Sequence, residues 1–435
     1  MTRHDVVIVG GGLIGLLTAT ELAERGAGVL VLEKDDVGFE QSGRSVAAVN
    51  LPGGSPNGGP DSMLRACADE WATFEDRWGC RIDLNDEGWH IVVADEADEE
   101  WMGIDRLTWN ETAGYPDSET LDVDSARTRF PTLQGPFRSL EVRNGGHVDA
   151  TLVMRGLTQA AGRLGVEIRP GTLVTGFDRR GDELTAVRTG SGQVACGSVI
   201  VAAGVWSPYL CDLLGLHVPM QRVRAPALET DPLPAETIPG FVRGSTFGAR
   251  QNANGTVRVT GGYRYSAMLH DLSLNDFRDL RMWAPAFWKN RKDVSLRVSP
   301  KTLTTEVSSA FAALRAGKGQ TVVPQGYDVS SRPRDRSKQL RDLGRLIPAV
   351  NAARVRRTFA GVIDLLPDLQ PVIGRIPGAG NAFVSTGFSG HGYMYGPGAC
   401  RAMAELIVDG RTTIDLQPYR PERLTEKLSM RSQIF

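Results

Sequence analysis

The chain has 435 residues and a formal net charge of −2, because 49 lysines and arginines stand against 51 aspartates and glutamates. This balance argues against a protein that binds nucleic acid by neutralising phosphates. Hydrophobic residues make up 41% of the chain, which excludes a disordered protein, and the length predicts about two or three domains.

No uninterrupted apolar run approaches the roughly 18 residues that a membrane-spanning helix requires. An apolar stretch begins at Val6, but Asp5 precedes it and Gly10 to Gly12 interrupt it, which favours a buried strand over a signal peptide. The five cysteines are widely spaced and form no CxxC pair, so neither a disulfide framework nor a zinc site is indicated. We therefore expect no metal, no membrane span and a cytoplasmic location.

The segment from His4 to Lys34 is the most informative part of the chain. The β-branched run Asp5–Val9 predicts a buried parallel strand. It leads into Gly10–Gly15, which fits the pattern G-x-G-x-x-G and is followed by a helical pattern. A second apolar run, Val29–Leu32, predicts another strand that ends at Glu33. Strand, glycines, helix and second strand together indicate a dinucleotide-binding unit.

Each part of this unit has a physical role. Gly10 permits a tight turn, Gly12 lets a pyrophosphate approach the backbone, and Gly15 lets the helix pack closely on the strand. The helix N-terminus offers unpaired N–H groups to the phosphates. Glu33 is placed to accept hydrogen bonds from an adenosine ribose. The unit alone does not distinguish FAD from NAD.

Later segments add to this prediction. Gln41–Ser45 has small residues and one cation, which suits a loop along a pyrophosphate and a flavin edge, although an ordinary surface turn explains it equally well. Asp149 predicts the N-cap of a helix that Gly165 ends. Ser198–Ser207 reads as a buried strand that runs into Gly204, where the backbone comes close to a ligand again.

Near the C-terminus, Gly387–Gly392 precedes another helical pattern, which predicts a second helix N-terminus at the ligand. Its dipole would stabilise negative charge on the pyrimidine side of a reduced flavin, and an NAD enzyme has no need of this second site. With Phe359–Asp364 and Pro367–Gly374, these segments resemble the FAD-dependent D-amino acid oxidase family, which contains glycine oxidase and the sarcosine oxidases. The resemblance covers residues 1–50, 145–210 and 355–410.

The resemblance implies non-covalently bound FAD, because Gln41 and Ser42 stand where a covalent flavin would need histidine and no cysteine lies between Val355 and Tyr395. The residues expected to contact the cofactor are Gly10, Gly12, Leu13, Ile14, Gly15, Glu33, Lys34, Ser42, Gly43, Arg44, Ser45, Val174, Ala203, Gly204, Trp206, Gly361, Ile363, Gly387, Phe388, Gly390, His391, Gly392, Tyr393 and Met394.

The fold class that follows is α/β plus α+β: a Rossmann-type FAD-binding domain with an inserted substrate domain whose sheet is mostly antiparallel. The alternating stretches Trp89–Val93 and Val257–Tyr265 fit that inserted sheet. The expected FAD-binding domain comprises residues 1–80, 145–224 and 355–435, and the substrate domain residues 81–144 and 225–354, with an extra helical segment at 272–325 that would form a lid or an oligomer contact.

Two departures from the family pattern bear on the substrate. In glycine and D-amino acid oxidases a basic residue in the segment equivalent to Gly361–Ile363 binds the substrate carboxylate, and this chain has Ile363 there. Monomeric sarcosine oxidase has a lysine where this chain has Met394. Free small amino acids are therefore doubtful substrates unless another cation serves. The pattern around Asp364 and Asp368 is nearer that of the heteromeric sarcosine oxidases and N-methyl amino acid dehydrogenases.

The candidate catalytic residues are Arg264 with its neighbours Tyr263 and Tyr265, and His391. Arg264 is the first candidate for a carboxylate-binding cation and Arg250 the second, although a surface arginine on an edge strand is the alternative for Arg264. His391 is expected to support the reduced flavin, and a purely structural hydrogen bond is the alternative.

The activity that the resemblance implies is oxidation of a C–N bond in a CH–NH or CH–NH2 donor. A neutral amine, such as an N-substituted glycine or another secondary amine, would give a hydride to the flavin, and water would hydrolyse the imine. Dioxygen as acceptor would give hydrogen peroxide, and a quinone or a partner protein is the other acceptor. Two other functions stay open: oxidation of a 2-hydroxy acid, and an FAD-binding subunit that needs a partner chain.

Overall fold

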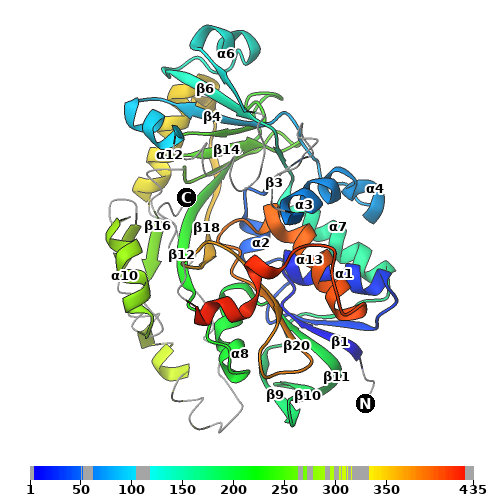
Figure 1. The fold of residues 1–435 in the computed structure, drawn as a ribbon. Coiled ribbons are helices and arrows are strands. Elements are labelled where there is room, and N and C mark those ends of the chain that lie inside the picture. The colour runs from blue at the N-terminus through cyan, green and yellow to red at the C-terminus, as the bar shows by residue number, and fades with distance from the viewer. Residues whose placement is uncertain are drawn as a thin grey trace.

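The computed structural model describes residues 4–49, 51, 62–103, 118–262, 268–271, 278–289, 294–297, 303–304, 306–309, 311, 315 and 333–426. Two large β-sheets organise these residues. Figure 1 shows the first at the lower right, around β1 and β11, and the second running from the centre to the top of the molecule. The predicted combination of an α/β unit and a mostly antiparallel unit is confirmed.

The first sheet contains the glycine-rich unit. Its main path is β19 (Val372–Arg375), β20 (Ala382–Thr386), β11 (Gly192–Val201), β1 (His4–Val9), β2 (Val29–Leu32) and β8 (Glu167–Arg169), and β9 (Val174–Arg180) and β10 (Glu183–Thr189) continue from β11. Strands β20, β11, β1, β2 and β8 are parallel, and β19, β10 and β9 are antiparallel to their neighbours. Because β1 lies between β2 and β11, the loop after β1 opens at a switch point, where parallel sheets bind ligands.

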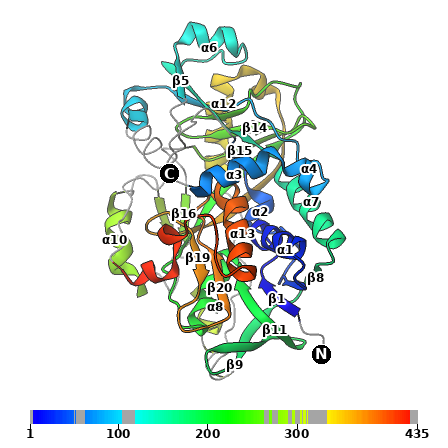
Figure 2. The same ribbon diagram turned by 45° about the vertical axis from the view of Figure 1, so that its right-hand side comes forward.

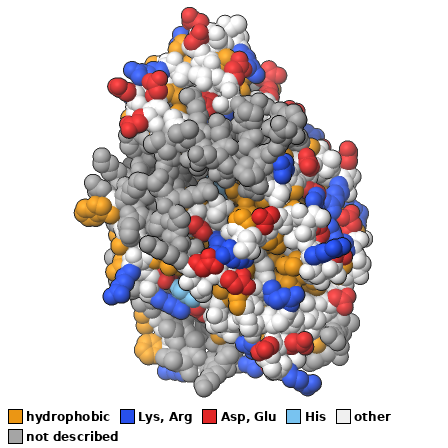
Figure 3. Space-filling view, in the orientation of Figure 1, with side chains coloured by type: hydrophobic (Ala, Val, Ile, Leu, Met, Phe, Trp, Pro, Cys, Tyr) orange, Lys and Arg blue, Asp and Glu red, His pale blue; other side chains and the backbone are white. Residues whose placement is uncertain are grey.

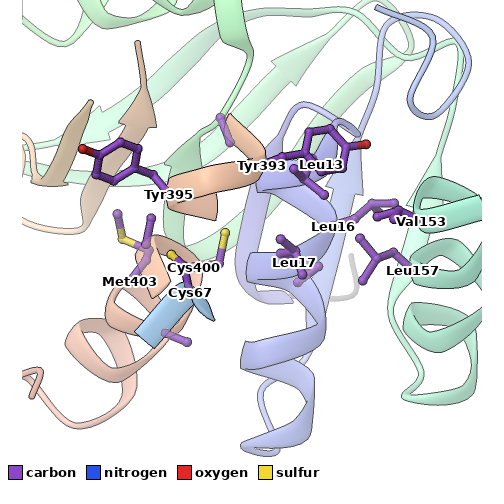
Figure 4. Packing of buried hydrophobic residues seen from close by; sticks show 14 of the residues in the cluster. Leu13, Leu16, Leu17, Cys67, Val153, Leu157, Tyr393, Tyr395, Cys400 and Met403 are labelled. Atoms are coloured by element: carbon purple, nitrogen blue, oxygen red, sulfur yellow. The ribbon is translucent and has the colours of Figure 1, made fainter. Parts of the chain in front are cut away.

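Helices cover one face of this sheet. They are α1 (Leu13–Glu24), α3 (Ser62–Ala72), α7 (Ala150–Arg163) and α13 (Gly392–Val408). In β1 the alternating side chains Val6 and Ile8 face these helices, and Val7 and Val9 face a second core that includes residues of α8 (Ser207–Leu213), β9 and β10. Figure 2 shows α1, α7 and α13 next to one another, and Figure 4 shows leucines of α1 between α7 and α13. The four-residue run Val6–Val9 is buried on both sides, as a parallel strand requires.

The ends of these helices follow the sequence signals. The carboxylate of Asp149 accepts hydrogen bonds from the N–H groups of Thr151 and Leu152 at 2.7 and 3.1 Å, so the predicted N-cap of α7 is confirmed. Gly165, with φ +79°, follows the end of α7 as predicted. The segment Gln41–Arg44, predicted as a loop, forms one helical turn, α2.

The second sheet is mostly antiparallel. Its path is β17 (Val294–Arg297), β16 (Met268–Asp271), β12 (Gln221–Thr230), β15 (Val257–Thr260), β14 (Gly248–Gln251), β13 (Phe241–Arg243), β4 (Trp89–Val93), β6 (Ser139–Arg143) and β5 (Ser118–Leu121), and β18 (Val355–Leu365) pairs with β12. Only the pairs β13–β4 and β16–β17 are parallel within the described chain. One face of this sheet packs on α12 (Pro333–Leu346) and η2 (Pro348–Ala352) through a core that includes Leu343 and Val350.

The long paired strands β12 and β18 extend from the second sheet toward the first (Figure 1). β18 lies within the range predicted for the FAD-binding domain, yet it pairs over its length with β12 of the second sheet. The predicted domain boundaries themselves stay a prediction. Most of the predicted extra segment, residues 272–325, lies outside the described residues; of it, α10 (Leu280–Lys289) and β17 are described.

The remaining elements are α4 (Phe74–Trp78), α6 (Val123–Arg129), η1 (Gly204–Trp206), η3 (Gln417–Tyr419), η4 (Pro421–Thr425) and the small sheet of β3 (Ala48–Val49) and β7 (Gly146–His147). On the face shown in Figure 3, acidic and basic side chains intermingle over the described surface, as the near-zero net charge suggests. Within the described ranges, no helix combines the length and the hydropathy needed to cross a bilayer.

Candidate functional site

Three glycines shape the loop between β1 and α1. Gly10 has φ +117°, and a Cβ on it would lie 2.3 Å from the carbonyl oxygen of Ala202. A Cβ on Gly15 would lie 1.9 Å from the carbonyl oxygen of Gly10. Gly12 differs, because a Cβ on it would meet only the hydroxyl oxygen of Ser42, at 3.0 Å. The first and last glycines are therefore required by packing, and the middle one leaves the N-terminus of α1 open.

Glu33 joins this loop to the end of β2. Its Oε2 accepts a hydrogen bond from the N–H of Gly11 at 2.7 Å, and its Oε1 accepts one from the N–H of Asp35 at 2.8 Å. The next residue, Lys34, forms an ion pair with Asp35, and its Nζ lies 5.0 Å from the centre of a Trp206 ring. The acid at the end of β2 thus holds the glycine loop in place.

An open cavity of about 1220 Å³ runs along these loops. This volume includes space that is open to solvent, so the residues that line the cavity indicate its ligand better than its size does. The predicted cofactor-binding residues that line it are Gly10, Gly12, Leu13, Ile14, Glu33, Lys34, Ser42, Ser45, Val174, Ala203, Gly204, Trp206, Phe388, Gly390, Gly392 and Tyr393.

The other predicted cofactor-binding residues are absent from the cavity wall: Gly15, Gly43, Arg44, Gly361, Ile363, Gly387, His391 and Met394. Several of these are packing positions. A Cβ on Gly43 would lie 2.6 Å from the carbonyl oxygen of Gly38, and one on Gly361 would lie 2.3 Å from Oε1 of Gln41. Ile363 packs in a small apolar cluster with Trp283. Close backbone and side-chain packing within the protein thus explains why glycine stands at positions that the sequence predicted to contact the ligand.

Two helix N-termini meet this one cavity. Gly12 is the N-cap of α1 and His391 the N-cap of α13; neither N-cap residue caps its helix through its side chain, and neither first turn has an acidic residue, although the N–H of Leu13 donates to Oγ of Ser42 at 2.9 Å. Gly12 and Leu13 line the cavity at the first helix, and Gly390 and Gly392 line it at the second. The buried hydroxyl of Ser385, on the cavity wall, has no hydrogen-bond partner. The cavity therefore offers polar groups and two positive helix ends to a ligand with acceptor atoms.

Asp364, at the end of β18, is a further cavity residue. Its Oδ2 accepts hydrogen bonds from the N–H groups of Gly387 and Phe388 at 2.9 and 3.1 Å, and its backbone oxygen accepts one from Ser389 at 3.3 Å. Burial raises the pKa of Asp364 to about 6, against the opposing effect of these hydrogen bonds. Asp364 therefore fixes the late glycine loop and carries a carboxyl group that ionises close to neutral pH.

Sequence reasoning used Asp364 only as part of a pattern, although a single acid ending a buried apolar run is a usable signal. It missed Gly38, Phe39 and Thr172, which also line the cavity. The N–H of Gly38 donates to the carbonyl oxygen of Gly11 at 3.0 Å, and that of Thr172 donates to the carbonyl oxygen of Glu33 at 2.7 Å. These contacts join loops that are far apart in the sequence. The one usable sequence signal among them is glycine at position 38, whose φ of +71° is left-handed.

The predicted catalytic residues divide into two groups. Tyr263, Arg264 and Tyr265 lie outside the described residues. His391 is partly buried at the start of α13, where its N–H donates to the carbonyl oxygen of Phe388 at 2.8 Å. The same hydrogen bonding holds the turn that brings Gly390 to the cavity.

The second candidate cation, Arg250, is described and fully buried on β14. It is the register partner of Arg258 on β15, which is 1% exposed. Nη1 of Arg250 donates to Oδ1 of Asn252, whereas its Nε and Nη2 have no partner. Arg258 donates to the carbonyl oxygen of Ser45 at 2.7 Å and to Oε2 of Glu229 at 3.1 Å. Burial and the neighbouring charge of Arg258 lower the pKa of Arg250 to about 9, so Arg250 is a cation at neutral pH.

Two further buried groups lie within electrostatic reach of Arg250. Burial and the charge of Arg250 hold the pKa of His147 well below its ordinary value, so its imidazole is neutral, and Nδ1 has no partner. The hydroxyl of Tyr393 donates to the carbonyl oxygen of Ser42 at 2.9 Å. Burial raises the pKa of Tyr393, and the charges of Arg258 and Arg250 oppose that rise. A tyrosine on the cavity wall is therefore close to both arginines.

Comparison with known proteins adds to this geometry. The chain is 24% identical to a glycine oxidase of Pseudomonas putida over 96% of its own length and 98% of that protein's length. It is 24% identical to a sarcosine oxidase subunit beta of Rhizobium meliloti over 97% of its own length and 88% of that protein's length. The fold superposes on the structure of L-amino acid deaminase from Proteus myxofaciens in complex with anthranilate, with a TM-score of 0.81, 20% identity, and coverage of 97% of this chain and 94% of that one.

The sequence profile of the DAO family, described as FAD dependent oxidoreductase, matches residues 5–406. This range includes both helix starts at the cavity, Asp364 and the two buried arginines. Matched over nearly its whole length, the chain belongs to the DAO family of FAD-dependent oxidoreductases.

Proposed function

We propose that this protein binds FAD without a covalent link and oxidises a C–N bond of an amine, with N-substituted glycines, other N-substituted amino acids or other secondary amines as its substrates. The observation that carries the proposal is that the N-termini of two helices from opposite ends of the chain, neither with an acidic first turn, reach the same cavity. FAD has hydrogen-bond acceptors at two separate places, the pyrophosphate in its middle and the pyrimidine ring of the flavin at one end, which match two such helix ends.

The residues present fit the cofactor. Gly12 and Leu13 would receive the pyrophosphate at the start of α1, with Ser42 beside them. Gly390 and Gly392 would receive the flavin at the start of α13. When bound, FAD would supply the oxidising chemistry, as the acceptor of a hydride from the carbon next to the substrate nitrogen; the resulting imine would be hydrolysed by water. The chain has to hold the two partners in contact, keep the site dry and provide local charge.

Particular side chains support these tasks. The buried aromatic and apolar side chains of Trp206, Val174 and Phe388 on the cavity wall exclude water from it. Asp364 holds the late glycine loop through three hydrogen bonds to successive N–H groups. No residue has to act as a general base if the amine enters unprotonated.

Two of the relatives support the substrate class. Both glycine oxidase and the sarcosine oxidase subunit beta are named for small amino acids or their N-methylated form. At 24% identity they support the class and do not choose within it. In our proposal the pattern around Asp364 and Asp368, which is nearer that of the heteromeric sarcosine oxidases, favours the N-substituted compounds over free glycine.

The test is anaerobic stopped-flow reduction of the purified, FAD-loaded protein by primary, N-methyl and N-carboxymethyl amino acids, with 2-hydroxy acids alongside. We expect N-methyl or N-carboxymethyl compounds to bleach the flavin, and 2-hydroxy acids to leave it oxidised. Hydrogen peroxide on admission of air would identify dioxygen as an acceptor. Bleaching by 2-hydroxy acids alone would refute the proposal.

A third result would refute the proposal that this protein acts as an enzyme on its own. If FAD binds but no amine reduces it, while a complex co-expressed with a partner chain is reduced, the protein is a subunit of a larger assembly. The co-expression experiment is included because one relative is named as a subunit, the sarcosine oxidase subunit beta. Protein that is colourless and takes up no FAD would contradict the whole proposal. A cytoplasmic location is part of the proposal and can be checked by cell fractionation.

A further inference from the structure

The buried arginine pair of the second sheet contains a guanidinium, that of Arg250, to which no carboxylate of the described chain is bonded. Arg250 is 0% exposed, and it makes no ion pair within the described part of the chain; its one hydrogen-bond acceptor is the amide oxygen of Asn252. Its register partner Arg258 is also a cation, and Glu229, the carboxylate next to Arg258, is bound by Arg357 as well, at 2.8 Å. Asp149 and Glu229 attract Arg250 through space, but its Nε and Nη2 have no bonded anion, and a buried charge is stabilised most by a partner that bonds to it directly.

The free donors of Arg250 have a definite shape. Nε and Nη2 are the two nitrogens without partners, and they present N–H groups on the same edge of the planar guanidinium. This edge matches the two oxygens of a carboxylate, which it binds through two parallel hydrogen bonds. His147, which lies close enough for the charge of Arg250 to lower its pKa, is neutral and cannot supply the missing negative charge.

The pair lies beside the candidate site. Residues on one face of a strand alternate, and register partners share a face, so Arg250 and Arg258 lie on the same face of the second sheet as Gly361 and Ile363 of β18. That face contacts α2, because Arg258 bonds to the carbonyl oxygen of Ser45 and Gly361 lies against Gln41. Ser45, Gln41 and Tyr393 all line the cofactor cavity. An anion on Arg250 would therefore sit next to the cavity.

We infer that Arg250 is the carboxylate-binding residue of this protein and that Arg258 positions it. The substrate carboxylate bonds to Nε and Nη2 of Arg250, and Arg258, fixed by Ser45 and Glu229, is its register partner on the adjacent strand. This inference rests on the proposed function for the identity of the substrate, which is an amine that carries a carboxylate. Where glycine and D-amino acid oxidases have a basic residue this chain has Ile363, and Arg250, the second candidate cation of the sequence analysis, would take that role.

The test uses the FAD-loaded protein and a carboxylate that cannot react. Acetate is titrated against the visible spectrum of the oxidised flavin and, in parallel, by calorimetry, and its neutral isostere acetamide is titrated in the same way. We expect acetate to bind, and Arg250→Met to weaken it by at least about 30-fold, because two charge-assisted hydrogen bonds are lost. Acetamide should bind weakly to both proteins and show no such difference.

Arg357→Met is the matched control. Arg357 lies on the same sheet face and bonds to the same Glu229, but it is 54% exposed. Its removal takes away an equal charge without touching the free edge of Arg250, so acetate affinity should stay within about twofold. A similar loss of acetate binding in both variants would mean that general electrostatics, not Arg250, binds the anion, and would overturn the inference.

A second variant guards against loss of folding. If Arg250→Met retains no FAD, Arg250→Lys keeps the charge but has no two-donor edge, and we expect acetate affinity to fall by about tenfold. Unchanged acetate affinity in a folded Arg250 variant overturns the inference. So does chloride that competes with acetate at equal concentration, which would show a site for any small anion.

The two proposals fail separately. If acetate binding depends on Arg250 but no amine reduces the flavin, the proposed amine oxidation is wrong and the carboxylate site stands. If N-methyl amino acids reduce the flavin but Arg250→Met leaves their half-saturating concentration unchanged, the amine oxidation stands and the carboxylate site is wrong. An amine substrate without a carboxylate should reduce the flavin of wild type and of Arg250→Met equally well in either case.

Discussion

Asp364→Asn tests the electrostatics of the cavity directly. Burial raises the pKa of Asp364 from an ordinary 3.8 to about 6, so the folded protein holds this proton more tightly than the unfolded chain. The stabilising effect is complete below about pH 4 and is lost as the pH rises through 6. A shift of about two units corresponds to roughly 3 kcal/mol. Asparagine keeps an oxygen for the N–H groups of Gly387 and Phe388 and does not ionise.

The measurable part of this effect lies between pH 5 and pH 8. Moving from one unit below the folded pKa to well above it removes about 1.4 kcal/mol of wild-type stability that the variant does not lose. For a chain of 435 residues, with an unfolding entropy of roughly 2.1 cal/mol/K per residue, this is a shift of about 1.5 °C in Tm.

The assay is thermal unfolding of the flavin-free protein, followed by circular dichroism at both pH values. The difference in Tm between Asp364→Asn and wild type should change by about 1.5 °C in favour of the variant at pH 8. A difference that is the same at both pH values would refute the raised pKa. A difference that moves toward the wild type at pH 8 would mean that hydrogen bonds to the carboxylate outweigh its burial.

Two further predictions concern backbone positions. Gly15→Ala should lower both Tm and FAD retention, because its Cβ would lie 1.9 Å from the carbonyl oxygen of Gly10 and overpacking costs about 1–3 kcal/mol. Gly162→Ala is the matched control. Gly162 lies in a helix with open space around it, so this change should stabilise the protein slightly. Equal effects of the two changes would refute the packing argument. Asp149→Ala should lower the unfolding free energy by about 1 kcal/mol, measured from denaturant curves, because two N–H groups at the start of α7 lose their cap. Asp149→Asn keeps an acceptor oxygen and should recover most of this stability. If Asp149→Asn recovers none, the charge of Asp149, and not its hydrogen bonds, stabilises the helix.

The cofactor half of the protein could be predicted because its determinants are local. The strand Asp5–Val9, the glycines that follow and Glu33 lie within about thirty residues, and each contributes a conformational or steric requirement that a sequence records. Gly10 and Gly15 stand where a Cβ would collide with backbone, so the prediction rested on the same contacts that the structure has. The single turn of helix at Gln41–Arg44 was missed because four residues carry no periodicity.

The substrate half could not be predicted in the same way. Arg250 and Arg258 face each other across a hairpin, and Glu229 and Gly361 reach the same face through strands that are far apart in the sequence. No local pattern distinguishes a buried arginine from an exposed one, and arginines are mostly exposed. The sequence therefore favoured Arg264, next to two tyrosines, over Arg250, whose burial depends on the packing of α2 against the sheet.

The strand β18 explains why the cofactor site and the inferred carboxylate site are adjacent. Along its last residues the side chains alternate: Val362 and Asp364 line the cofactor cavity, whereas Gly361 and Ile363 share the other face with the buried arginines. Because successive residues serve different faces, a change at position 363 can alter the substrate side and leave the cofactor side intact. If Arg250 binds the substrate carboxylate, as we propose, the cation comes from the same face of the sheet but from β14, which is separated from β18 by β12 and β15. A difference in substrate from relatives with a basic residue at that position would thus require no change in the FAD cavity.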